Sequence, residues 1–278
     1  MLNASLANRL HCSFRSFALV FASLTLAGGL QTRPGGKGSQ PSMPTVDNAS
    51  RIVSTPPNYR FPNSQTLVYG VEWHLFNAGT TKVRMDTDGA LQRVTATADS
   101  AGMVNVLYSI HDRFEAHFDA RTFCSQRVSK HIEEGPHRRD TQIEFDYRNR
   151  KGRLNEKNLK TGEVKTTQND IPPCVTDVVT GFSYLAAQPL QLGNTYVFPM
   201  NDGGKTTDVI ARVETREQVK VPAGTYQALR VTAEPESGAL KGRAKVTVWF
   251  SETEHTPVQM RSKLGWGTLF FRLLRIEK

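Results

Sequence analysis

The segment from Pro172 to Pro189 most constrains the fold, because it predicts one amphipathic helix in a chain that otherwise reads as strands. Asp177 suits the positive end of such a helix, Thr176 can cap it, and Pro189 ends it. A lone amphipathic helix must bury its apolar side on a sheet. We therefore expect a helix at about 176–187 packed on a β-sheet. Its apolar side chains share one stripe with helical spacing: Val175, Val178, Val179, Phe182, Leu185 and Ala186.

The rest of the chain from residue 65 alternates apolar and polar residues, as half-buried strands do. The alternation is clear in Leu67–Trp73 and Ala244–Phe250, and turn signals such as Asn201–Gly204 recur between the segments. This pattern predicts a mainly β protein of about ten to twelve strands. We expect a single strongly curved antiparallel sheet or an open β-barrel, with the helix on its concave face.

Two shorter segments carry weaker signals. Residues 100–110 fit either a short helix or a crossover, because Met103, Val106 and Leu107 have helical spacing. Residues 149–167 read as a basic hairpin, with Gly152 and Gly162 as its turn points.

The first 29 residues have the pattern of a signal peptide. Arg9 and Arg15 precede the apolar run Phe17–Leu26, and small residues follow it. The alternative is a membrane anchor, but the run is short for a bilayer core of about 30 Å. Residues 30–64 read as a flexible Pro/Gly/Ser-rich linker, and residues 65–278 as one β-rich domain. We expect an exported protein, most simply periplasmic, with no membrane span after cleavage.

The charge balance is basic, with a formal net charge of +9. Loss of residues 1–29 removes two arginines and no acids, and leaves +7. Such a surface favours anionic partners, namely lipid headgroups or anionic glycans, and an envelope protein is also possible. Nucleic acid is not expected for an exported protein. Simple solubility is the alternative explanation of the charge.

Cys124 and Cys174 are the two cysteines left after the leader. A pair in an oxidising compartment predicts one disulfide. The alternative, a reactive thiol, lacks a nearby histidine or a C-x-x-C motif.

Motifs that would indicate catalysis are absent. Ser183 lacks the flanking glycines of a nucleophile elbow. Glu133 and Glu134 are adjacent, so on a strand they point to opposite faces and cannot act as a glycosidase pair. On a strand, Glu115, His117 and Asp119 share a face with Arg113, which disfavours a metal site. We therefore predict no enzyme, metal or cofactor, while an active site assembled from distant residues stays open.

Two candidate binding sites follow from composition and motifs. Aromatic residues exceed the needs of one sheet face, so some could line an apolar cleft beside the helix; the alternative is a well-packed core. The candidate cleft residues are Trp73, Phe118, Phe182, Tyr184 and Trp249.

The second candidate is an anion-binding turn, for which a plain hairpin turn is the alternative. Its candidate residues are Asn201, Asp202, Gly203, Gly204 and Lys205, with Arg138 and Arg139 on a basic rim.

Several short motifs follow one another in order over residues 66–277. They are Leu67–Trp73 with Ala78-Gly79, Asp112–Glu115, Arg138–Asp140, Phe145–Tyr147, Pro172-Pro173 with Asp177, Ser183–Leu185, Asn201–Lys205, Val221–Tyr226, Val248–Ser251 and Thr256–Val258. Taken together, these motifs resemble the bacterial exported proteins grouped as domain of unknown function 3108. The resemblance implies export and a curved antiparallel β fold, and it supplies no reaction or ligand. A looser likeness is to unclosed β-barrels with a helical lid that carry lipoproteins across the periplasm.

The function predicted from the sequence is non-catalytic binding of an apolar or amphiphilic ligand, or of an envelope component. The alternative is a structural or interaction protein without a small ligand, and an enzyme is the third possibility. Gly181 in the middle of the helix leaves two states open, since glycine permits close packing on the sheet but also loosens the helix by about 1 kcal/mol. The helix could be a fixed plug or a mobile lid.

Overall fold

The computed structural model describes residues 52–54, 56–74, 76–202, 204–237, 244–264 and 267–278. The predicted signal peptide and most of the predicted linker lie outside these residues. The described chain forms one antiparallel sheet of 14 strands and two α-helices. The mainly β fold with a helix in its concavity is therefore confirmed, while the predicted strand number is too low.

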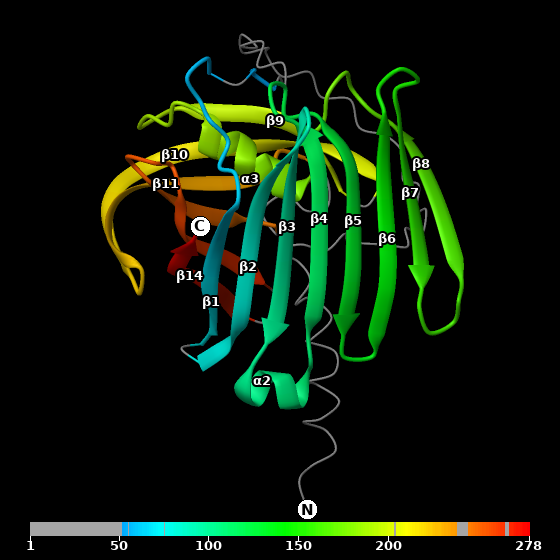
Figure 1. Ribbon diagram of the computed structural model, residues 1–278, viewed down its shortest axis with the longest axis horizontal. Helices are drawn as coiled ribbons and strands as arrows, with labels where there is room; N and C mark the ends of the chain where they lie inside the picture. Colours follow the sequence, from blue (N-terminus) through cyan, green and yellow to red (C-terminus); the bar gives the residue numbers. More distant parts are fainter. Residues whose placement is uncertain (1–51, 55, 75, 203, 238–243, 265–266) are drawn as a thin grey trace, which may run out of the picture.

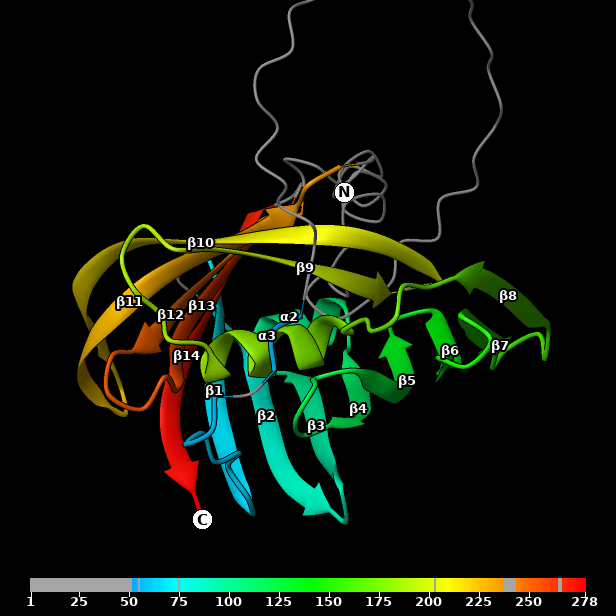
Figure 2. The ribbon, with the colours of Figure 1, turned by 90° about the horizontal axis from the view of Figure 1, so that it is seen from above.

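The strands follow a simple path through the sheet. The order is β8-β7-β6-β5-β4-β3-β2-β1-β14-β13-β12-β11-β10-β9, so the chain runs outward from β1 to one edge, crosses to the other edge, and returns to pair β14 with β1. The two arms curve over one another without closing (Figures 1 and 2). The strands are β1 (Gln65–Trp73), β2 (Phe76–Asp88), β3 (Leu91–Ser100), β4 (His111–Asp119), β5 (Ser125–Glu134), β6 (His137–Asp146), β7 (Lys151–Asn158), β8 (Val164–Asp170), β9 (Thr195–Asp202), β10 (Lys205–Val221), β11 (Gly224–Pro235), β12 (Val246–Ser251), β13 (Pro257–Leu264) and β14 (Gly267–Glu277).

Helix α3 (Val178–Ala187) lies in the crossing segment, between the two arms of the sheet (Figure 2). Asp177, and not Thr176, caps it, because its carboxylate accepts hydrogen bonds from the backbone N–H groups of Val179 and Thr180. Thr176 instead pairs with β9: its N–H donates to Pro199 O, and Asn201 N–H donates to Thr176 O. The capping residue is therefore Asp177, one position after the predicted Thr176, because the backbone of Thr176 is paired with β9.

The middle of α3 packs closely on β9. A Cβ atom added to Gly181 would lie 2.9 Å from Met200 Cε and 3.2 Å from Phe198 Cε2. Tyr184, one turn later, packs edge-on against Phe198 and Phe123, with ring centroids 5.0 and 5.6 Å apart. The glycine therefore permits a close approach of α3 to β9 in this conformation.

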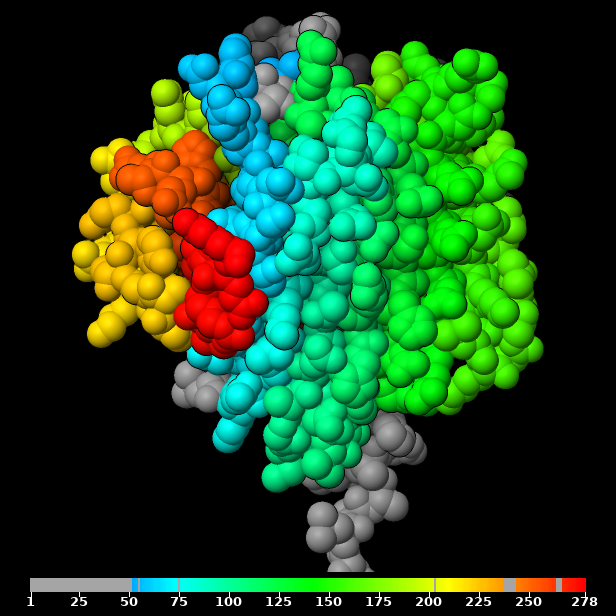
Figure 3. Space-filling view, in the orientation of Figure 1, coloured from blue at the N-terminus to red at the C-terminus, as the bar shows by residue number. Residues whose placement is uncertain are grey.

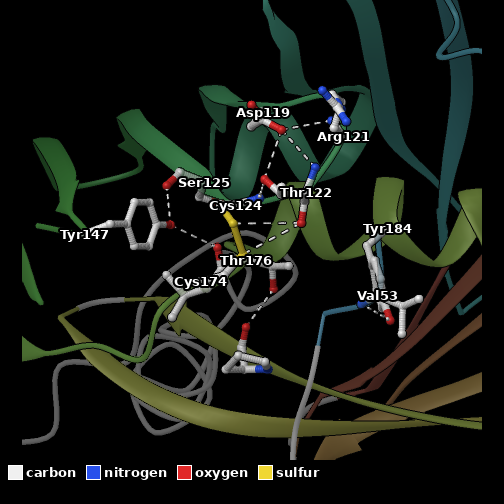
Figure 4. The surroundings of a disulfide bond; sticks show 12 residues. Val53, Asp119, Arg121, Thr122, Cys124, Ser125, Tyr147, Cys174, Thr176 and Tyr184 are labelled. Atoms are coloured by element: carbon white, nitrogen blue, oxygen red, sulfur yellow. Dashed lines mark hydrogen bonds between the residues drawn. A yellow bond between two sulfur atoms is a disulfide. The ribbon is translucent and has the colours of Figure 1, made fainter. Parts of the chain in front are cut away.

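The predicted disulfide between Cys124 and Cys174 is confirmed (Figure 4). It ties the β4–β5 turn to the segment that enters α3. Beside it, Ser125 Oγ donates to the capping carboxylate of Asp177 at 2.7 Å, and Tyr147 OH donates to Ser125 O at 2.5 Å. Covalent and hydrogen-bonded links therefore fix the start of α3 to β5.

The two segments with weak sequence signals, residues 100–110 and 149–167, have different outcomes. Residues 100–110 contain α2 (Gly102–Leu107), so the helical interpretation is confirmed. Gly162 lies in the β7–β8 turn with φ +74°, as predicted. Gly152 is not a turn point, because it lies within β7, where an added Cβ would be 3.0 Å from Asn169 Oδ1. The β6–β7 turn instead uses Arg150 at φ 56°.

Candidate binding site

An apolar pocket lies between α3 and the inner face of β1, β2 and β3. The space available to the centres of water-sized spheres is about 100 Å³, and all space between the atoms, open solvent included, is about 790 Å³. The sheet register explains the wall: Leu67 pairs with Val83, and Val83 pairs with Ala96, so all three side chains share the inner face. Met85 and Val94 form the next pair along the same strands. The strands thus supply an aliphatic floor.

Helix α3 forms the opposite wall with Val179, Phe182 and Ala186. These positions are three or four residues apart, so they lie on one face of the helix. Tyr69 also lines the pocket, and its hydroxyl donates to Pro257 O at 2.7 Å. The hydroxyl therefore has a hydrogen-bond partner within the protein, and mainly the ring faces the pocket.

The segment before β1 covers part of the pocket. Phe61 contributes to the lining, and its ring packs edge-on against Phe118 with centroids 5.4 Å apart. Tyr59 is also a lining residue, and burial raises the pKa of its phenol to about 12. Farther back, Val53 N–H donates to Tyr184 OH at 3.4 Å (Figure 4). The described end of the predicted linker is therefore packed on the domain.

The polar groups of the pocket come mainly from the β12–β13 turn. Glu254, His255 and Thr256 lie there, and Gln65 and Ser183 add to them. His255 Nδ1 lies 3.0 Å from Ala186 O, which joins the turn to the end of α3. An apolar cavity with a few polar groups matches the general character of small-molecule sites.

The structure brings only one of the five predicted cleft residues, Phe182, into this pocket. Phe118 and Tyr184 are fully buried in the aromatic core beside it. Trp73 packs against Tyr108 and Ile110, near the far end of β1. Trp249 faces Arg261, whose guanidinium lies 5.7 Å from the ring centroid. Sequence reasoning followed the aromatic residues, whereas the pocket wall is mostly aliphatic.

The predicted anion-binding residues do not converge. Asp202 contacts the ammonium of Lys130, and the buried Asn201 donates from Nδ2 to Thr206 Oγ1 at 2.8 Å. Arg138 and Arg139 are neighbours on β6 and point to opposite faces, toward Glu133 and Glu156. Gly204 has φ +77°, which suits a hairpin turn, Lys205 begins β10, and Gly203 lies outside the described residues.

Sequence reasoning missed a buried acid pair, Asp112 on β4 and Glu134 on β5. Burial raises the pKa of Glu134 to about 8, and the nearby charge of Asp112 adds to this shift. Burial likewise raises the pKa of Asp112, although Glu133 N–H donates to its carboxylate at 3.0 Å. Glu133 points to the other face, as predicted. Strand alternation separates Glu133 from Glu134, but the acid that meets Asp112 depends on how β4 and β5 pair.

Other chemistry is limited within the described residues. They contain no group of three or more His, Cys, Asp or Glu side chains that could hold a metal ion. Neither of the helices in this part of the chain combines the length and apolar character of a membrane span.

One solved structure shares the fold. A β-barrel-like protein of Brucella abortus, of domain of unknown function DUF1849, superposes with a TM-score of 0.53 at 10% identity, over 82% of this chain and 99% of that one. Two further structures superpose with TM-scores of 0.35 at 10% identity. One, from Bacteroides fragilis, has a YmcC-like fold and is provisionally described as exported; 78% of this chain and 97% of that one are covered. The other, from Parabacteroides distasonis, is provisionally described as a lipoprotein, with 78% and 96% covered.

No curated protein matches the sequence. The family of proteins of unknown function DUF3108 matches residues 68–274, which is most of the sheet and all of α3. No catalytic family is indicated by these matches. The chain belongs to the DUF3108 family.

Proposed function

We propose that this protein binds an apolar or amphiphilic ligand in the bacterial cell envelope and performs no chemistry on it. The observation that carries the proposal is the pocket between α3 and β1–β3, whose walls are aliphatic and aromatic. Burying apolar surface is worth about 25 cal/mol per Å², so an acyl chain or a similar group would gain affinity there. The polar β12–β13 turn would suit the polar end of an amphiphile.

An envelope location is part of the proposal. The leader-like pattern of residues 1–29 favours export. The disulfide between Cys124 and Cys174 favours an oxidising compartment, because such bonds are rare in the cytosol. A binding protein also fits the lack of a catalytic motif in the sequence.

Mass spectrometry under native conditions tests the proposal on protein purified from its host. We expect a co-purifying lipid or a similar amphiphile, which denaturation releases. After delipidation, a fluorescent fatty acid should bind, and oleic acid should displace it. A native mass equal to that of the protein alone, together with no uptake of the fatty acid, would contradict ligand binding. A stable protein partner in that case would favour the structural alternative.

A matched pair of variants locates the site. Ala186→Phe adds a ring to the α3 wall of the pocket. Ala223→Phe makes the same change at another partly buried alanine, in the β10–β11 turn away from the pocket. We expect the first variant to weaken fatty-acid binding at least about tenfold and the second to leave it within about twofold. Equal effects would place the ligand elsewhere.

A further inference from the structure

Four large apolar side chains project from one end of the sheet. They are Phe76 at the start of β2, and Met103, Val106 and Leu107 on α2; their exposed fractions are 71%, 73%, 79% and 62%. We call these four residues the apolar tip. Figure 1 places α2 at the lower end of the strands, and Figure 3 shows it projecting beyond them. Single exposed apolar residues are ordinary, but a contiguous group of this size marks an interaction site.

The helical part of the tip is anchored to the sheet by contacts on both sides of α2. Val104 is the buried residue of α2, and Ala101 N–H donates to Ala78 O at 2.9 Å. Tyr108, which follows the helix, packs against the β5–β6 turn, where an added Cβ at Gly135 would lie 2.7 Å from its ring. One apolar residue of α2 therefore anchors the helix, and the other three face outward.

Basic side chains continue along the same end of the sheet. Gly135 N–H donates to Ser109 O, which places the β5–β6 turn beside α2, and Leu159 N–H donates to Arg138 O, which places the β7–β8 turn next. The exposed basic residues in these turns and at the adjoining strand ends form the basic flank: Arg138, Lys157, Lys160 and Lys165. Three acids offset part of this charge: Glu133, 4.0 Å from Arg138, Asp140, which lies opposite Lys157 in the sheet, and Glu163. Glu156 lies opposite Lys165 but also pairs with Arg139. The four basic residues therefore exceed the three acids by one charge.

We propose that the apolar tip and the basic flank dock the protein on a membrane surface that contains anionic lipids. The tip is convex, so its side chains can enter the boundary between headgroups and acyl chains, while the lysines meet lipid phosphates. The positive flank complements anionic headgroups and favours the membrane.

The docking surface is separate from the pocket. Phe76 pairs with Trp73 at one end of β1 and β2, whereas the pocket residues Gln65 and Met85 pair at the other end. The two proposals can therefore fail independently. The pocket variant Ala186→Phe should bind vesicles as the wild-type protein does.

Vesicle sedimentation tests the docking surface with protein purified from its host, on phosphatidylcholine vesicles with and without about one third phosphatidylglycerol. The wild-type protein should bind the anionic vesicles, and added salt should weaken this binding. Met103→Ser/Val106→Ser should weaken it at least about tenfold. Leu192→Ser, at an apolar residue with 53% exposure outside the tip, is the matched control and should bind within about twofold of wild type.

The basic flank has its own variant. Lys157→Gln/Lys160→Gln/Lys165→Gln should weaken binding to anionic vesicles about tenfold or more and remove most of the salt dependence. Circular dichroism and thermal melting would verify that each variant is folded. The proposal is overturned if wild-type protein ignores anionic vesicles, if the tip variant binds as tightly as the Leu192 control, or if the tip is instead protected by a protein partner.

Discussion

Lys130 on β5 contacts the carboxylate of Asp202 on β9, across the inside of the curved sheet. β9 is one edge strand, and β5 belongs to the opposite arm. Near this contact, Asn169 of the other edge strand donates to Thr206 Oγ1 of β10 at 3.4 Å. Side chains therefore bridge the two arms, since the edge strands β8 and β9 form no ladder with each other.

Replacement of Asp202 by leucine would leave the ammonium of Lys130, which is only 5% exposed, without its carboxylate. We expect the free energy of unfolding to fall by about 3–5 kcal/mol. The double variant Lys130→Met/Asp202→Leu should recover most of this loss, because no buried charge remains. Urea denaturation of the two single variants and the double variant measures the coupling. Additive losses would show that the contact contributes nothing.

Removal of the disulfide should destabilise the domain. The bond closes a loop with a sequence separation of 50 residues, and such loops are worth about 4 kcal/mol in the chain-entropy model. Cys124→Ser/Cys174→Ser should therefore lower Tm markedly, and reductant should lower Tm of the wild-type protein to a similar value. Reductant should leave Tm of the double variant unchanged. Insensitivity of the wild-type protein would show that the bond does not limit unfolding.

The buried acid pair should make stability fall as pH rises. Glu134 has a pKa raised from 4.5 to about 8, so the folded state holds a proton that the unfolded state releases. Stability from this group is complete below pH 4.5 and is lost as pH rises toward 8, with a slope of up to about 1.4 kcal/mol per pH unit.

Glu134→Gln keeps the shape of the side chain and removes its ionisation. The fall in stability between pH 5 and 8 should therefore shrink, as measured by urea denaturation at several pH values. Glu133→Gln, on the outer face of the same strand, is the control and should keep the slope of the wild-type protein. The same slope in both variants would exclude Glu134 as its source.

The close contact of Gly181 with β9 predicts a steric penalty. Gly181→Leu would drive a side chain into Met200 and Phe198, and overpacking of this kind costs about 1–3 kcal/mol. Ser183→Leu, at a half-buried position on the same helix, should cost less, because it faces the pocket. Thermal denaturation compares the two variants. A stabilised Gly181→Leu protein would indicate that α3 can move away from the sheet.

The sequence alone determined the features that depend on local periodicity. Alternation in Leu67–Trp73 and helical spacing around Val178–Phe182 specify which side of each element is apolar, because side chains repeat every two residues on a strand and every 3.6 on a helix. The β class and the helix followed from such patterns, whereas the family resemblance rested on specific motifs. The disulfide followed because only one pair of cysteines remains after the leader.

Only the tertiary structure decided which inward side chains meet. Leu67, Val83 and Ala96 share the pocket floor through strand register, and Glu134 meets Asp112 because β4 and β5 are neighbours. Lys130 reaches Asp202 across the curvature of the sheet. Periodicity assigns a side chain to a face, but its partners come from register and curvature. Both depend on contacts between residues far apart in the chain, which local patterns do not encode.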